Sequence, residues 1–338
     1  MAFTLGCGTN ISEWLSQSQR RGAERAAFFG EEDVRTIARL GFDHIRLPVD
    51  EEQLWDEHGA RDPEAFKLLN AALDWCEAAG LRAVVDLHIL RTHYFNQEET
   101  PRLFTDPAET QRFAGLWRDL SACMASRPVD LVAYELLNEP VARDPRDWNR
   151  VALAGLAAIR EREPERVVVL GSNWFNQTHT FDMLEVPKGE NILLTFHYYR
   201  PMPLTHYTAP WWGGGAYTGP VHYPGPCVTR RDLLQFPEDL RIILEQEDAL
   251  DNWGPERIER DFQMPVQVAR RSGYPLYCGE WGVYQKAPEG PRLAWYRDMV
   301  RLFDKYHIAY ANWDYKGGFA PVVRDGRPSE IAGLLVQF

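Results

Sequence analysis

Strand-like and helix-like segments alternate along most of this chain. The strand-like segments are short, nearly all apolar runs at residues 4–8, 42–47, 81–87, 131–137, 167–171, 191–196, 275–279 and 308–312. Segments with helical spacing or helix-capping residues lie between most of them, at residues 31–40, 63–79, 108–125, 146–162, 255–271 and 292–306. Continuous apolar runs are typical of parallel strands that are buried on both faces. The alternation therefore predicts an α/β fold, the (β/α)8 TIM barrel.

A doubly wound open sheet is the main alternative to the barrel. Such a sheet usually carries a glycine-rich phosphate-binding turn after an early strand. The segment Gly6-Cys7-Gly8 is only a weak match to that turn. A chain of 338 residues, 45% of them hydrophobic, can bury the core of one barrel. We therefore expect residues 1–338 to form a single barrel domain with a long loop after the sixth strand.

The charge of the chain limits the partners that it can attract. It has 37 basic and 49 acidic residues, a formal net charge of -12, which opposes non-specific binding to nucleic acid or anionic membranes. No apolar run approaches the ~20 residues that span a bilayer, and the first residues lack the pattern of a signal peptide. We expect no nucleic-acid or membrane partner. As numbered, the chain is expected in the cytoplasm; if a signal peptide had been removed from it, it would be secreted.

The cysteines indicate neither a disulfide framework nor a zinc site. All five are scattered along the chain and none forms a Cys-x-x-Cys pair. Most are expected to be small core residues. We expect no metal or other cofactor.

Two carboxylates lie at the ends of predicted strands. The apolar run at residues 131–137 is followed by Asn138, Glu139 and Pro140, and a later apolar run ends at Glu280. A single Asn-Glu-Pro sequence could be an ordinary turn, since proline cannot continue a strand ladder. Two such strand ends predict a shared site, because the C-terminal ends of barrel strands lie on one face.

Other polar and aromatic residues occupy the same kind of position. A lone arginine or histidine usually belongs to a satisfied polar network, and a lone tryptophan usually belongs to the core. Their co-location at predicted strand ends favours a functional site instead, because barrel enzymes hold their active sites there. These residues are Arg46, His88, Asn138, His197, Tyr199 and Trp313, beside Glu139 and Glu280.

This set of residues resembles the signature of glycoside hydrolase family 5, the cellulase-like retaining β-glycosidases. The resemblance implies a catalytic barrel in which Glu139 is the general acid/base and Glu280 is the nucleophile. The reaction requires such a pair, since a retaining glycosidase uses one protonated and one ionised carboxyl group ~5–5.5 Å apart. The matching motifs are Ile45-Arg46-Leu47-Pro48, Asp86-Leu87-His88, Asn138-Glu139-Pro140, His197-Tyr198-Tyr199, Gly279-Glu280 and Trp313.

The resemblance also implies roles for the residues around the two carboxylates. Arg46 and Tyr199 would lie beside Glu280, favour its ionised form and lower its pKa. His197 would support Glu139 and its proton transfer.

Substrate contacts follow from the same resemblance. Asn138 would hydrogen-bond the sugar 2-hydroxyl, His88 would hold another hydroxyl, and Trp313 would form the floor on which the ring stacks. Trp174 and Trp14 follow other predicted strands and are weaker candidates for sugar platforms.

Two segments depart from the family pattern. Many endoglucanases of the family have a Pro-Gly turn after the histidine of the third strand, whereas His88 is followed here by Ile89-Leu90-Arg91. The connection over residues 200–252 is long and rich in Trp, Tyr, Gly and Pro, and it includes Trp212. Such a segment on the active face is expected to contact substrate, although it could also be a structural flap.

Together these features predict a retaining hydrolase of β-linked glucans or gluco-oligosaccharides, with a β-linked oligo- or polysaccharide as its binding partner. A secreted endo-β-1,4-glucanase, a β-mannanase or an exo-β-glycosidase of the same family are alternatives. Outside the family, a metal-dependent barrel hydrolase could use His88, His93, Glu139 and His197. A non-catalytic carbohydrate-binding barrel is a further alternative, although it would be expected to have lost a carboxylate.

Overall fold

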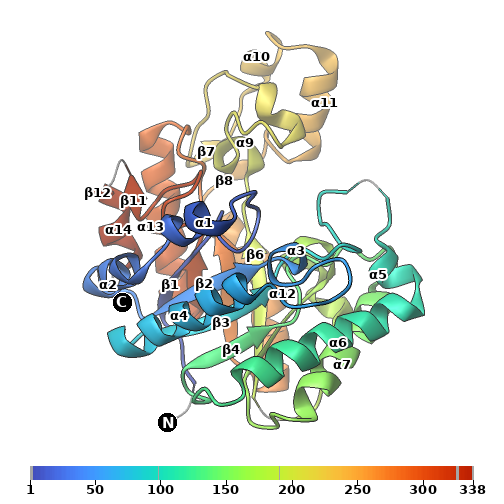
Figure 1. The fold of residues 1–338 in the computed structure, drawn as a ribbon. Helices are drawn as coiled ribbons and strands as arrows, with labels where there is room; N and C mark the ends of the chain where they lie inside the picture. Colours follow the sequence, from blue (N-terminus) through green and yellow to red (C-terminus); the bar gives the residue numbers. More distant parts are fainter. Residues whose placement is uncertain (1–2, 98, 190, 325–326, 337–338) are drawn as a thin grey trace.

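Eight parallel strands close into a barrel at the centre of the molecule (Figure 1). The computed structural model describes residues 3–97, 99–189, 191–324 and 327–336. Around the barrel the strands follow the order β1-β10-β9-β6-β5-β4-β3-β2. Because β1 pairs with both β2 and β10, the predicted (β/α)8 barrel is confirmed and the doubly wound alternative is wrong. The strands are β1 (Cys7–Asn10), β2 (His44–Val49), β3 (Arg82–Leu87), β4 (Val132–Glu135), β5 (Val168–Gly171), β6 (Ile192–Tyr198), β9 (Leu276–Trp281) and β10 (Ala309–Asn312).

Helices surround the barrel, and the long ones lie close to the predicted ranges. They are α2 (Glu31–Arg39), α4 (Pro63–Ala79), α6 (Pro107–Met124), α7 (Pro145–Arg160), α12 (Pro255–Ser272) and α13 (Glu289–Tyr306). β5 departs from the pattern, because only the short α8 (Asn173–Asn176) and the 3-10 helix η1 (Thr178–Met183) follow it. The remaining short elements of the barrel are α1 (Gly22–Phe28), α3 (Glu51–Leu54), α5 (Arg102–Thr105), α14 (Glu330–Leu335), β11 (Val323–Arg324) and β12 (Arg327–Pro328).

Three of the long helices begin with an Asp-Pro pair. The carboxylates of Asp62, Asp106 and Asp144 accept hydrogen bonds from backbone N–H groups in the first turns of α4, α6 and α7. The proline that follows each aspartate has its φ already set for a helix and has no N–H group to leave unpaired. α4 ends at Gly80, whose φ of 73° is in the left-handed region. These local signals explain why the helices could be placed from the sequence.

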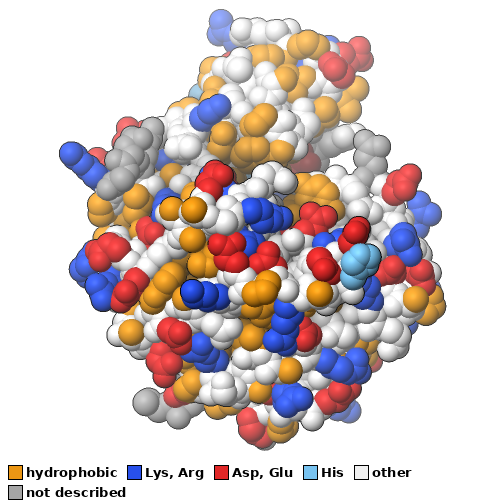
Figure 2. Space-filling model, in the orientation of Figure 1, with side chains coloured by type: hydrophobic (Ala, Val, Ile, Leu, Met, Phe, Trp, Pro, Cys, Tyr) orange, Lys and Arg blue, Asp and Glu red, His pale blue; other side chains and the backbone are white. Residues whose placement is uncertain are grey.

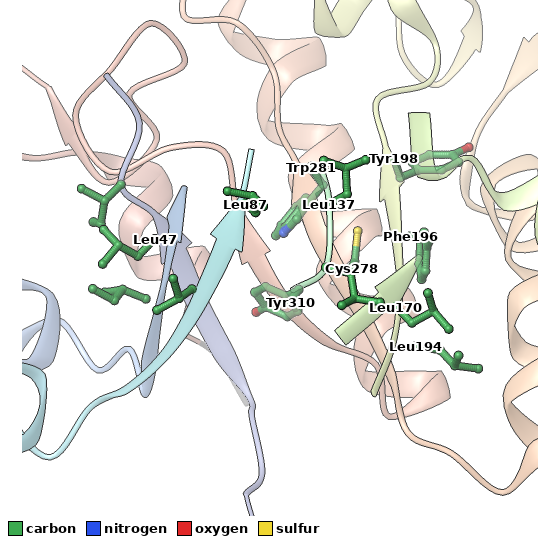
Figure 3. Close-up of a cluster of buried hydrophobic side chains, with 14 of the residues drawn as sticks. Leu47, Leu87, Leu137, Leu170, Leu194, Phe196, Tyr198, Cys278, Trp281 and Tyr310 are labelled. Atoms are coloured by element: carbon green, nitrogen blue, oxygen red, sulfur yellow. The ribbon is translucent and has the colours of Figure 1, made fainter. Parts of the chain in front are cut away.

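Side chains alternate along the strands between the outside and the inside of the barrel. In β6, Phe196 packs outward on Phe262 of α12, and Figure 3 shows it with Leu194 and Tyr198 in the apolar layer between strands and helices. Leu193 joins a separate apolar cluster inside the barrel. Polar residues occupy the inside nearer the C-terminal ends of the strands. They include Asn10, Arg46, Asp86 and Glu135, all buried.

The segment predicted as a long loop after the sixth strand is a folded insertion. It contains α9 (Met202–Thr205), η2 (Gly213–Ala216), α10 (Arg230–Leu233) and α11 (Glu238–Gln246), and β7 (Gly225–Pro226) pairs with β8 (Asn252–Trp253). Buried apolar side chains hold it together, among them Tyr217, Leu233, Leu240 and Leu244. Figure 1 shows it at the end of the barrel away from the N-terminus. The long connection after the sixth strand is therefore confirmed, and the structure adds that it is folded around short helices and a two-stranded sheet.

Among the described residues, no helix combines the length and the apolar character needed to cross a membrane. On the face shown in Figure 2, basic and acidic side chains are interspersed over the barrel.

Candidate active site

Glu139 and Glu280 face each other at the C-terminal end of the barrel, with His197 between them. Glu139 follows β4, Glu280 lies in β9 and His197 lies in β6. The Nδ1 atom of His197 is 2.9 Å from Glu139 Oε1 and 3.7 Å from Glu280 Oε2. A side-chain nitrogen or oxygen from each of the three residues lies within 4.8 Å of the others. Carboxyl groups this close fit the ~5–5.5 Å spacing of a retaining glycosidase rather than the wider spacing of an inverting one.

A β-bulge accompanies the placement of Glu280. The register between β6 and β9 shifts just before His197, which pairs with Glu280. Bulges of this kind re-aim side chains next to active sites. A side chain at Gly279 would meet Thr195 Oγ1 at 2.9 Å and His197 Nε2 at 3.3 Å. Glycine at position 279 therefore permits the close approach of β6 and β9 that brings His197 to Glu280.

Arg46 is a buried cation that connects Glu280 to the polar interior of the barrel. Its guanidinium spreads its donors over five side chains, the arrangement for which arginine's planar fork is suited. The predicted contact between Arg46 and Glu280 is therefore present. The distances are 2.7 Å from Nη1 to Glu280 Oε1, 2.9 Å from Nη1 to Asn10 Oδ1, 2.7 Å from Nε to Glu135 Oε2, 3.0 Å from Nη2 to Asn138 Oδ1 and 3.0 Å from Nη2 to Asp86 Oδ2.

Burial and charge distinguish the pKa values of Glu139 and Glu280. Burial raises the pKa of Glu139 well above its usual value, and the neighbouring Glu280 carboxylate raises it further. Burial also raises the pKa of Glu280, but Arg46 and the Tyr199 hydroxyl, 3.0 Å from Oε2, lower it. Arg46 and Tyr199 thus act on Glu280 in the predicted direction, but burial outweighs them and its pKa is raised overall. Glu139 is still the carboxyl group that holds its proton to higher pH, as the acid role requires.

The carboxyl groups below the catalytic pair also bind protons more tightly than usual. Burial raises the pKa of Asp86 to about 7 and that of Glu135 to about 6, although Arg46 opposes both shifts. The single guanidinium of Arg46 cannot neutralise every carboxylate around it. The carboxyl groups of Asp86 and Glu135 therefore keep their protons to higher pH than usual.

His197 is held in one orientation by Asn176 of α8. Asn176 Nδ2 lies 3.4 Å from His197 Nε2. Burial, with Arg46 nearby, moves the pKa of His197 well below its usual value, so the ring is neutral. If Asn176 donates to Nε2, the ring proton is on Nδ1 and His197 donates to Glu139 Oε1. The contact between His197 and Glu139 is therefore present, and the support of proton transfer by His197 stays a prediction. Asn176 was missed by sequence reasoning because α8 has no motif that marks it.

Three further predicted site residues lie beside Glu139 and Glu280, as expected. They are His88, Asn138 and Trp313. The His88 ring is stacked on Trp313, with 5.7 Å between ring centroids, and its Nδ1 is 2.6 Å from Asp86 Oδ2. Asn138 Nδ2 is buried and has no hydrogen-bond partner among the described residues. A buried donor without a partner is costly, so this amide is available for a sugar hydroxyl. The specific sugar contacts of the three side chains stay predictions.

An aromatic wall borders this end of the site. We give this name to the cluster of Ala209, Tyr284, Trp313 and Phe319 with Tyr199 and Trp212 packed on it. Trp212 is therefore next to the residues of the site, and Trp211 beside it is 53% exposed. Trp174 is 43% exposed after β5, and its role as a sugar platform stays a prediction. Trp14 is wrong as a platform, because it is fully buried and its Nε1 donates to the carbonyl of Arg25 at 2.8 Å.

Asp86, Glu135 and Asn10 are site residues that the sequence prediction did not select. Asp86 and Glu135 each interrupt an otherwise apolar strand segment, and such a charged residue in a buried strand needs a partner. That signal could have identified both as partners of Arg46. Asn10 carried no comparable signal.

The residues proposed for a metal centre are not brought together as a set. Of His88, His93, Glu139 and His197, only the last two belong to the compact group of nitrogen and oxygen atoms described above, within the part of the chain that the structure describes. His93 is fully buried beside Phe104 and the Nδ1 of His88 contacts Asp86. The metal-dependent alternative therefore lacks the site on which it was based.

Comparison with known proteins identifies the family. Residues 17–318 match the family described as Cellulase (glycosyl hydrolase family 5). The chain belongs to glycoside hydrolase family 5. This family 5 protein is an O-glycosyl hydrolase with the (β/α)8 fold, as the resemblance of its motifs implied.

Named relatives match nearly the whole family 5 chain. It is 31% identical over 313 residues to Endoglucanase C of Acetivibrio thermocellus, covering 91% of this chain and 90% of that protein. It is 28% identical over 304 residues to Cellodextrinase A of Ruminococcus flavefaciens, covering 89% and 83%. Among solved structures, Thermotoga maritima Cel5A in complex with mannotriose has the same fold, with a TM-score of 0.76, 24% identity and coverage of 98% and 96%.

Proposed function

We propose that this family 5 enzyme hydrolyses β-linked gluco-oligosaccharides with net retention of configuration, by double displacement. The observation that carries the proposal is the arrangement of Glu139 and Glu280 on either side of His197, 2.9 and 3.7 Å from its Nδ1. The names of the relatives, an endoglucanase and a cellodextrinase, support a β-glucan as the substrate class.

In the first step Glu139 is the acid and Glu280 is the nucleophile. The proton of Glu139 passes to the glycosidic oxygen as the bond from that oxygen to the anomeric carbon breaks. A carboxylate oxygen of Glu280 attacks the same carbon and forms a covalent glycosyl-enzyme. With the ring proton on Nδ1, His197 donates to Glu139 Oε1, 2.9 Å away, and Oε2 is left to carry the proton that is transferred.

In the second step Glu139 acts as a base. It accepts a proton from water while the water oxygen attacks the anomeric carbon from the face that the leaving group occupied. The bond to Glu280 breaks, so Glu280 is again a carboxylate and Glu139 is again protonated. Two inversions at one carbon give net retention.

The insertion supports a preference for short substrates. It contributes Ala209 and Trp212 to the aromatic wall, and Trp211 beside them is largely exposed. Figure 1 shows the insertion at the same end of the barrel as the segment between β3 and α5. Segments that rise on both sides of a site restrict it, and exposed aromatic rings stack on sugar faces. Internal cleavage of long glucans is the leading alternative, because one relative is named an endoglucanase.

Viscosity and reducing ends, followed together on soluble β-glucan, test the substrate length. Hydrolysis that starts at chain ends or prefers short oligomers releases reducing ends with little early loss of viscosity. A steep early loss of viscosity per bond cut would mean internal cleavage in an open cleft and would refute the restricted site. β-Mannan and manno-oligosaccharides belong in the same screen, and faster hydrolysis of these than of the glucans would refute the glucan preference.

A further inference from the structure

The insertion reaches the nucleophile through Tyr199. This residue directly follows β6, and the insertion begins just after it with α9. The Tyr199 hydroxyl donates to Glu280 Oε2 at 3.0 Å. Its ring packs on two others, 5.2 Å from His206 and 5.8 Å from Phe319 by ring centroids, and these two rings are themselves 5.7 Å apart. The tyrosine that contacts the nucleophile is therefore held partly by a side chain of the insertion.

Thr205 fixes the orientation of that side chain. It is fully buried, and its hydroxyl donates to the backbone carbonyl of Tyr199. The Nδ1 atom of His206 is 3.1 Å from Thr205 Oγ1. Burial lowers the pKa of His206 to about 3, so the ring is neutral. Since the single hydroxyl proton of Thr205 is directed to the carbonyl, His206 carries its own proton on Nδ1 and donates it to Oγ1.

A second contact ties the same turn to the strand of the nucleophile. The backbone N–H of Tyr284, which follows β9, donates to the carbonyl of Thr205 at 2.7 Å. Tyr284 also packs on Phe319, at 5.7 Å. Thr205 is therefore bonded on one side to the residue that contacts Glu280 and on the other to the segment that follows Glu280.

We propose that Thr205 and His206 are positioning residues that hold the phenol of Tyr199 on Glu280, so that the insertion governs how strongly the nucleophile is hydrogen-bonded. The inference rests on the proposed role of Glu280 as nucleophile. Neither residue touches the reacting atoms, and both act through Tyr199.

The acidic limb of the pH profile reports this effect. Glu280 must be ionised to attack, and a hydrogen bond from Tyr199 favours the ionised form. Losing that bond raises the pKa of Glu280 and moves the acidic limb of kcat/KM to higher pH. Substitutions at Thr205 and His206 leave the other charged or titratable groups around Glu280 unchanged, so these groups do not produce the shift. They are Arg46, Asp86, His88, Glu139, His197 and Cys278.

The test compares Thr205→Val, which removes the hydroxyl at nearly constant shape, with Thr205→Ser, which keeps it. The substrate is an aryl β-cellobioside with a good leaving group. Tyr199→Phe removes the hydrogen bond to Glu280 completely and therefore defines the largest expected effect, an upward shift of the acidic limb by ~1 pH unit. Thr205→Val should move the limb by roughly half as much and Thr205→Ser by little. The inference would be overturned if Tyr199→Phe shifted the acidic limb of kcat/KM while Thr205→Val left it at the pH of the wild-type enzyme.

A double variant separates positioning from loss of stability. In the Tyr199→Phe background there is no phenol to hold, so adding His206→Phe should leave the acidic limb where Tyr199→Phe put it. His206→Phe alone, which keeps a ring but loses the Nδ1 donor, should shift the limb. Equal shifts in both backgrounds would contradict the inference even if all variants were less stable. A wild-type enzyme inactive on every β-glucoside would instead refute the proposed function.

Discussion

The guanidinium of Arg46 lies 2.7 Å from the carboxylate of Glu280, and both side chains are buried in the mouth of the barrel. This pair accounts for two properties of the site at once. Arg46 opposes the rise in the pKa of Glu280 that burial causes, and it connects Glu280 to the polar interior of the barrel. Removal of either partner should therefore affect catalysis and stability together.

Arg46→Met should abolish most activity and destabilise the fold. The change leaves Glu280 and Glu135 buried without their cation, and removing one partner of a buried ion pair typically costs about 3–5 kcal/mol. We expect at least a ~100-fold loss of kcat/KM, a typical scale for losing an electrostatic contact in an active site. Urea unfolding and steady-state rates measure the two effects.

The matched control for that substitution is Arg35→Met. Arg35 pairs with Glu31 on an exposed surface of α2, so its loss should change stability by less than ~0.5 kcal/mol and leave the rates intact. Similar stability losses in the Arg46 and Arg35 variants would contradict the importance of the buried network.

The pH profile of kcat/KM should be bell-shaped, with its alkaline limb set by Glu139. Burial and the charge of Glu280 raise the pKa of Glu139, and activity falls when the acid loses its proton. The two limbs belong to the coupled pair rather than to single residues. In Glu139→Gln the alkaline limb should disappear on an aryl glycoside that needs no acid, while oligosaccharide hydrolysis is nearly lost. An alkaline limb that stays in place in this variant would exclude Glu139 as the acid.

Glu139→Ala should be partly rescued by azide. The small anion can attack the glycosyl-enzyme without a general base, so turnover of an aryl glycoside with a good leaving group should recover with a β-glycosyl azide as the product. Glu280→Ala cannot form the intermediate and is the control. Equal azide effects in the two variants would reverse or remove the assigned roles.

Trp212→Ala should weaken binding of oligosaccharides more than that of a short aryl glucoside. Stacking on one ring contributes on the order of 1 kcal/mol, which corresponds to a rise in KM of roughly fivefold for substrates that reach the aromatic wall. Leu234→Ala is the control, since Leu234 is a 72% exposed side chain of the same insertion. Trp174→Ala tests in the same assay whether the tryptophan that follows β5 is a sugar platform. Unchanged KM values for all oligosaccharides in the Trp212 variant would assign that residue to packing alone.

Asp314→Asn should reduce the pH dependence of stability. Burial raises the pKa of Asp314 to about 6, although hydrogen bonds from Ser12 and the backbone of Ala320 lower it. A raised pKa in the folded state contributes stability below the unfolded pKa near 4, and that contribution is lost as pH rises through about 6. The wild-type free energy of unfolding should therefore fall by an extra ~2 kcal/mol from pH 4 to pH 7 relative to the variant. Parallel stability curves for the two proteins would show that this carboxyl group has an ordinary pKa.

The fold and most of the central site could be predicted because their signals are local. Asp-Pro pairs and buried apolar runs place helices and strands, and the barrel then brings the strand ends of Arg46, Glu139 and Glu280 to one face. The β-bulge before His197 could not be read from the sequence, since it depends on how β6 and β9 pair.

Other features could not be predicted because burial decides them. The net pKa of Glu280 depends on whether desolvation or Arg46 dominates, and a motif does not contain that balance. Asn176 reaches His197 through a short helix with no recognisable pattern, and Trp14 follows a strand yet is covered completely. The insertion was recognised by its composition, but its helices are too short to give a periodic signal.

Proton NMR of the first-formed product tests the central claim most directly. The account assigns Glu280 as the nucleophile and Glu139 as the acid/base, because atoms of the two carboxyl groups lie within 4.8 Å of each other, the close approach typical of enzymes that use two displacements at one carbon. In the first minutes of hydrolysis of a β-linked gluco-oligosaccharide, before mutarotation, the β-anomer should predominate at the new reducing end. An α-anomer as the first product would mean a single displacement and would contradict the account.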